Sequence, residues 1–103
     1  METDWLTETG RLLLTGYVYS GWMVRKAILA IVERDEEGHY FLSNETLGLY
    51  AVGVTQEEAL EDFKATLIDN YQYLEAKVGE DPDLQMLFRE YQKYLKRPAP
   101  LAV

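Results

Sequence analysis

One short stretch of the chain gathers residue types that could do chemistry, Asp35-Glu36-Glu37-Gly38-His39. Three carboxylates beside an imidazole suggest either a cation-binding loop or a histidine base oriented by an acid. A calcium loop spreads its oxygen ligands over about 12 residues and closes with a glutamate, and the chain lacks that spacing. The stretch is better interpreted as a tight turn, in which Gly38 takes a positive φ without steric cost.

The histidine itself is a weak candidate for catalysis. His39 is the only histidine of the chain, and base catalysis requires a positioned partner and a pocket. Glu57 and Glu58 are adjacent on a predicted helix, where neighbouring side chains do not face each other. The sequence contains neither a P-loop spacing nor a G-x-S-x-G nucleophile elbow. We therefore expect a protein that is not an enzyme, with no catalytic residue, bound metal or cofactor.

Length and composition bound the class of protein. The 103 residues, 48% of them hydrophobic, suffice for one domain with a core, with residues 1–10 as an N-terminal extension and 97–103 as a flexible tail. The absence of cysteine excludes disulfides and thiolate zinc sites and suits a reducing compartment. No apolar run approaches the roughly 20 residues of a membrane span, and the N-terminus lacks the pattern of a signal peptide. We expect a cytoplasmic protein.

The net charge of −8 is unevenly distributed along the chain. Residues 35–62 hold eight acids and no lysine or arginine, whereas residues 84–103 hold four bases and one acid. An acidic surface repels phosphate backbones, so direct DNA binding is doubtful, while a basic protein partner is compatible with it. A second interpretation remains open, in which the acids keep the surface soluble and the bases suit the C-terminal end of a helix.

Four segments have the composition of β-strands, about 11–19, 23–34, 39–43 and 47–54. The short polar connections between them predict an antiparallel sheet of three or four strands, in which the first segment is the optional fourth. Segment 23–34 is apolar on both of its faces, which is typical of a central strand covered on both sides. A second helix or a second copy of the chain must then cover the far face of the sheet, and we expect a homodimer.

The clearest local signal is the start of a helix over 56–78. Thr55 can accept a hydrogen bond from the Glu58 amide while the Glu58 carboxylate reaches back to the Thr55 amide, which together form a capping box. Apolar residues then follow at helical spacing, and Gly79 ends the helix as a C-cap. A second helix is predicted over 82–96. The chain therefore belongs to the α+β class, with the long helix packed on the sheet.

Two tyrosines fall outside the apolar stripes. Tyr73 lies off the stripe of its helix, and Tyr50 lies on the opposite strand face from its apolar neighbours. Such aromatic side chains are typical of protein interfaces, although both residues are equally consistent with packing on the second helix. With Glu36 and Glu37 of the acidic turn, they form the candidate partner interface.

Residues 27–75 resemble the HicB-like antitoxin domain, over about half of the chain. The matching segments are Ala27-Ile28-Leu29-Ala30-Ile31-Val32 for the first strand, Asp35-Glu36-Glu37-Gly38-His39-Tyr40 for the turn, and Gly53-Val54-Thr55-Gln56-Glu57-Glu58-Ala59-Leu60-Glu61-Asp62-Phe63 for the helix entry. The resemblance implies a truncated ribonuclease-H-like fold, a β-sheet backed by a helix, without ribonuclease activity. It also implies a protein that binds and silences a small basic RNase toxin.

Two segments depart from the HicB-like pattern. Asn44-Glu45-Thr46-Leu47-Gly48 replaces the family's proline-containing P-x-L-x-G stretch, and residues 80–103 are too short for its two- or three-helix DNA reader. We therefore expect a non-enzymatic, HicB-like antitoxin-type protein that binds a small basic partner, with operator binding in doubt. The alternative is a stand-alone structural or regulatory homodimer of the same fold with no toxin partner.

Overall fold

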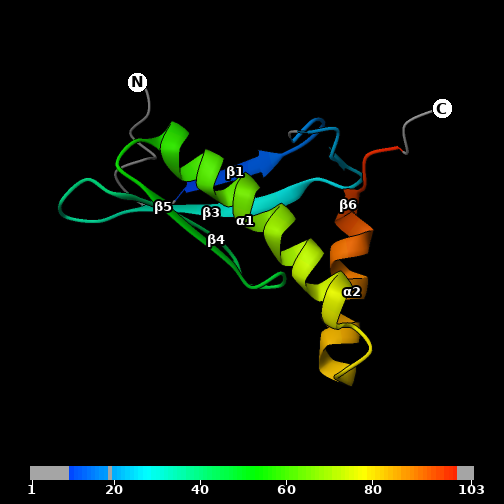
Figure 1. Cartoon of the computed structure of the whole chain (residues 1–103). Coiled ribbons are helices and arrows are strands. Elements are labelled where there is room, and N and C mark those ends of the chain that lie inside the picture. Colours follow the sequence, from blue (N-terminus) through cyan, green and yellow to red (C-terminus); the bar gives the residue numbers. More distant parts are fainter. Residues whose placement is uncertain (1–9, 19, 100–103) are drawn as a thin grey trace.

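The computed structural model describes residues 10–18 and 20–99 (Figure 1). Its main sheet is antiparallel, with the strand order β1-β3-β4-β5. The elements run β1 Gly10–Leu14, β2 Met23–Val24, β3 Ile28–Arg34, β4 Tyr40–Asn44, β5 Leu49–Gly53, α1 Gln56–Lys77, α2 Pro82–Tyr94 and β6 Leu95–Lys96. The α+β class predicted from the sequence is confirmed. The predicted N-terminal extension lies outside the described residues, apart from Gly10, which begins β1.

Helix α1 lies across one face of the sheet (Figure 1). Its apolar residues recur every three or four positions, so one stripe of the helix faces the strands. The buried residues of α1 are Ala59, Phe63, Leu67, Ile68, Tyr71 and Leu74. The buried residues of the sheet include Ile28, Ala30, Val32, Leu42 and Leu49. The core is therefore the layer between α1 and the four-stranded sheet.

The start of α1 uses a capping bond that the sequence predicts. Thr55 Oγ1 accepts from the Glu58 amide at 3.1 Å, which satisfies one of the free amides of the first turn. The reciprocal bond differs by one residue, because Glu58 Oε1 accepts from the Val54 amide, at 3.1 Å, and not from that of Thr55. Glu58 thereby ties the helix start to the residue that follows β5.

The end of α1 differs from the predicted glycine cap. The C-cap residue is Val78, in the right-handed conformation, and Gly79 has no positive φ. A turn follows in which the Glu80 amide donates to Lys77 O at 3.0 Å. The helix thus ends without the left-handed glycine that the sequence suggests.

The predicted strand over 23–34 is divided in two, because β2 pairs with β6 and β3 begins only after a bend. Within the bend, Arg25 donates its amide to Tyr94 O at 2.7 Å, which joins the chain to the end of α2. The predicted helix over 82–96 stops at Tyr94 for a related reason, since Leu95 is extended and pairs with β2.

Two outer segments remain to be compared with their predictions, the first strand and the C-terminal tail. The predicted strand over 11–19 is shorter, because β1 ends at Leu14. In the predicted C-terminal tail, Arg97 forms an ion pair with Glu75 of α1. Residues 100–103 lie outside the described part of the chain.

Helix α2 packs on α1 through a buried tyrosine. Tyr91 is completely buried, and its hydroxyl donates to Leu47 O at 2.6 Å and accepts from Asn70 Nδ2 at 3.0 Å. These two bonds join α2, α1 and the turn between β4 and β5. Burial raises the pKa of Tyr91, so the hydroxyl remains a neutral donor.

Replacing Tyr91 by phenylalanine should lower the free energy of unfolding by about 1–3 kcal/mol, because the ring stays buried while Leu47 O loses its donor. Urea unfolding followed by circular dichroism measures the change. Tyr50→Phe removes an exposed hydroxyl and is the matched control, with an expected change below about 0.5 kcal/mol. Equal effects of the two substitutions would contradict the role assigned to the Tyr91 hydroxyl.

Candidate functional site

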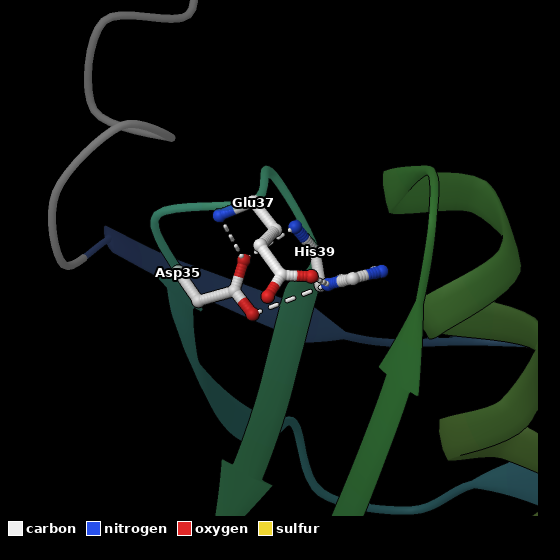
Figure 2. A network of polar contacts seen from close by, with 3 residues as sticks. All are labelled: Asp35, Glu37 and His39. Atoms are coloured by element: carbon white, nitrogen blue, oxygen red, sulfur yellow. Dashed lines mark hydrogen bonds and ion pairs between the residues drawn. The ribbon is translucent and has the colours of Figure 1, made fainter.

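The acidic stretch between β3 and β4 is a turn organised by one carboxylate (Figure 2). Asp35 Oδ1 accepts hydrogen bonds from the amides of Glu37, at 3.0 Å, and His39, at 2.8 Å. Asp35 Oδ2 lies 3.2 Å from His39 Nδ1. Gly38 takes a φ of 88°, as the sequence predicts, and donates its amide to Asp35 O at 3.1 Å. The first carboxylate of the stretch is thus engaged within the turn itself.

His39 has carboxylate partners in this turn, but it does not line a pocket that could hold a substrate. Glu37 Oε2 also lies 3.9 Å from His39 Nδ1, so two acids flank an imidazole that is 37% exposed. A shallow hollow of ≈ 440 Å³ is lined by Asp35 but not by His39. Among the described residues, no group of three or more His, Cys, Asp or Glu side chains is arranged to hold a metal ion. The contacts orient the ring and hold the hairpin together.

The same hydrogen bonds make the turn sensitive to acid. The bond from the His39 amide, more than any other contact, lowers the pKa of Asp35 below its usual 3.8. A carboxyl group whose pKa is lowered by folding stabilises the fold above its unfolded pKa, and this stabilisation is lost as the pH falls through the folded pKa. Asp35→Asn should therefore lower the melting temperature at neutral pH, and the deficit should shrink below pH 3.8.

Thermal unfolding of the two proteins over this pH range measures the deficit. Glu36→Gln changes the same charge on the next residue, which lies exposed in the turn, and should show no comparable deficit. A deficit for Asp35→Asn that stays constant from neutral pH to well below pH 3.8 would contradict the role of the ionised carboxylate.

Charge is separated along β3, which begins just after Arg25-Lys26 and ends just before Asp35-Glu36-Glu37. The register of β3, β4 and β5 places the acidic turn beside the start of α1, and Figure 1 shows both at one end of the molecule. We define the acidic end by Asp35, Glu36, Glu37, Glu57, Glu58 and Glu61. The opposite, basic end comprises Arg25, Lys26, Lys93, Lys96 and Arg97, of which Lys93 forms an ion pair with Glu90 and Arg97 with Glu75.

Large apolar side chains lie exposed on the face of the sheet away from α1. We call this surface the sheet face, and its exposed apolar members are Leu13, Leu29, Phe41, Tyr50 and Val52. The register pairs Leu13 with Leu29 on β1 and β3 and Phe41 with Val52 on β4 and β5, and Ile31, Ser43 and Glu33 lie between the two pairs. Of the two predicted covers for the far face of segment 23–34, the second helix does not provide one in the described chain, because α2 packs on α1 and leaves Leu29 of this face exposed.

Comparisons with protein-family models, with curated proteins and with solved structures found no match. What this chain binds must therefore be inferred from its own surfaces. Within residues 10–18 and 20–99, none of the helices combines the length and the apolar character that crossing a membrane requires.

The structure separates the four residues of the predicted partner interface. Tyr50, 66% exposed, lies on the sheet face, whereas Glu36 and Glu37 lie at the acidic end. Tyr73, 57% exposed, lies on α1 beside a hollow of ≈ 220 Å³ that α1 and α2 share with the β4–β5 turn. Sequence reasoning did not single out Phe41 and its neighbours on the sheet face, although strand alternation places them on the same side as Tyr50.

Proposed function

We propose that this chain is a non-enzymatic, HicB-like antitoxin-type protein of the cytoplasm, which binds a small basic protein of the RNase toxin kind. The observation that carries the proposal is the separation of charge, which gathers acids from the hairpin turn and from α1 at one end. The fold supports it as well, because a sheet backed by a helix is what the resemblance of residues 27–75 implies.

The acidic end acts mainly on the rate of encounter with a basic protein. Its carboxylates are exposed, and exposed ion pairs contribute little affinity. Complementary charge nevertheless speeds diffusional association and disfavours partners of the wrong sign. Glu36 and Glu37 lie exposed in the turn between β3 and β4, where a basic partner can reach them.

Capture of the tagged full-length chain from the cells that make it tests this proposal. We expect a small basic protein to be retained, and its ribonuclease activity to appear once it is separated from the chain. Capture repeated under several salt concentrations that never retains a basic ribonuclease would refute the toxin partner. Salt is varied because association steered by charge weakens as ionic strength rises.

Charge-neutral variants locate the surface that the basic partner uses. Glu36→Gln combined with Glu37→Gln should slow association and reduce its dependence on salt. Glu80→Gln combined with Glu90→Gln removes the same two charges outside the acidic end and should change the association rate little. If the second pair slows association as much as the first, net charge and not the acidic end governs the encounter.

The second candidate is a structural or regulatory homodimer of the same fold with no toxin partner. The open sheet face favours self-association in either case, because exposed apolar patches of this kind mark interaction surfaces. The proposal includes no operator binding, because a chain of net charge −8 repels the phosphate backbone of DNA.

A further inference from the structure

We infer that two copies of this chain associate through the sheet face, with their strands running in opposite directions. The inference rests on the homodimer of the proposed function and is independent of toxin binding. Four strands about 4.8 Å apart, each with about five residues rising roughly 3.3 Å, give a face of roughly 300 Å² in projection. Apolar side chains cover only part of this face, which they share with Arg11, Glu33 and Ser43, so a dimer formed through it is expected to be weak.

The charges on the sheet face favour a second copy over a basic partner. Arg11 of β1 and Glu33 of β3 are both exposed there, and Lys26 and Glu45 line a hollow at the rim of this face with Leu29 and Ile31. Bases and acids are thus equal in number on the sheet face, although the whole chain carries −8. Arg11 is aligned with Ile31, and Glu33 follows two residues later on the same face of β3. A basic protein gains no charge complementarity on such a surface and is attracted to the acidic end instead.

The position of these two charges makes the face complementary to itself. Consider a twofold axis that lies in the plane of the interface and runs perpendicular to the strands. It passes between the level of Arg11 and Ile31 and the level of Glu33, two residues further along β3. Rotation about it sets Arg11 of each copy one strand to the side of Glu33 of the other, and brings Tyr50 of one copy over Val52 of the other. The same rotation places Leu29 over the position of Asp35, so the apolar contact is centred on β4 and β5. Such reciprocal contacts are what an isologous interface between identical chains requires.

The same axis matches the charged ends of the molecule. It reverses the strands of one copy, so the acidic end of each copy lies toward the basic end of the other. With the strands in the same direction, the two acidic ends would lie together and repel each other. The separation of charge along β3 therefore selects the opposite direction of the strands.

A dimer could also form by edge-to-edge pairing of strands from two copies. Side chains of α1 hinder this pairing at the edge strand β5. The Val52 amide donates to Asp62 Oδ2 at 3.2 Å, and the Val54 amide donates to Glu58 Oε1 at 3.1 Å. Edge amides that are already bonded to side chains offer a poor template for a strand of another molecule. The open surface that β5 presents is therefore its face, which carries Tyr50 and Val52.

Sedimentation equilibrium of the purified full-length chain over a range of concentrations tests this interface. The wild type should shift from monomer to dimer as its concentration rises. Tyr50→Glu should remain monomeric where the wild type is a dimer, whereas Tyr73→Glu, the same change at a similarly exposed tyrosine of α1, should dimerise normally. A wild type that stays monomeric throughout, or loss of the dimer with Tyr73→Glu and not with Tyr50→Glu, overturns the inference.

A charge exchange tests the orientation of the two copies. Arg11→Glu and Glu33→Arg should each weaken the dimer, and the double variant should restore it, because the exchanged charges meet again across the axis. Circular dichroism confirms that each variant is folded. A double variant weaker than both single variants contradicts the antiparallel arrangement. Glu36→Gln with Glu37→Gln should leave the dimer intact, so failure of toxin binding and failure of this interface give different results.

Discussion

Phe63→Ala is expected to lower the free energy of unfolding by about 3–5 kcal/mol. Phe63 is completely buried on the stripe of α1 that packs on the sheet, and its loss leaves a cavity in addition to removing apolar contacts. A domain of this size is stabilised by roughly 5–15 kcal/mol in total. The substitution should therefore remove a large part of the stability of the fold.

Urea unfolding followed by tryptophan fluorescence measures this loss, and Phe41→Ala is its matched control. Phe41 is 41% exposed on the sheet face, so its truncation removes less buried surface and leaves no enclosed cavity. We expect a loss below about 1 kcal/mol for the control, measured at concentrations where the chain is monomeric. Comparable losses for the two phenylalanines would contradict the assignment of the core to the α1 side of the sheet.

Gly53→Ala is expected to destabilise the fold by about 1–3 kcal/mol, through overpacking and not through backbone strain. A Cβ atom at Gly53 would lie 2.3 Å from Ala59 N and 2.8 Å from the Glu58 carbonyl carbon. Both neighbours belong to the backbone of α1, so neither can rotate away. The first turn of the helix must shift from β5, which disturbs the capping bonds that begin it.

Gly79→Ala is the matched control for this substitution. Gly79 has no positive φ, and a Cβ added there would meet no atom within 4 Å. Alanine at such a position restricts the unfolded chain and should leave stability unchanged or raise it by up to about 1 kcal/mol. Thermal unfolding of both variants measures the difference. A Gly53→Ala protein as stable as the wild type would show that α1 does not approach β5 this closely.

Features that depend on neighbouring residues were predictable from the sequence. The turn that requires Gly38, the Thr55 cap and the apolar stripe of α1 each arise from a few residues close together in the chain. Their physical causes, steric freedom at positive φ, unsatisfied amides in the first helical turn and helical periodicity, are local. The α+β architecture follows from their order.

Features that depend on distant residues were not predictable. The pairing of β2 with β6 interrupts the predicted strand over 23–34 and shortens the predicted helix over 82–96. The residues around Arg25 contain no local signal that predicts this pairing. The bond from Tyr91 to Leu47 O likewise joins residues 44 positions apart. Such contacts are decided by tertiary packing, which overrides local preference.

The candidate surfaces were predictable only in part. Glu36 and Glu37 belong to the acidic end, as the charge pattern of the sequence suggests. Tyr50 and Tyr73 lie on different surfaces, which sequence spacing does not reveal because they belong to a strand and to the helix packed on its other side. An apolar pattern on both faces of segment 23–34 predicts that a cover is needed, but not whether it comes from the same chain or from another.

The most direct test of the sheet face as a binding surface is a dilution series followed by methyl NMR. As the concentration rises, we expect the signals of Leu13, Leu29 and Val52 to shift, while those of the buried Leu67 and Val32 stay constant. Tyr50→Glu should abolish the shifts. Concentration-dependent shifts confined to α1 and α2, or no shifts at any concentration, would contradict the assignment of this face to a second copy of the chain.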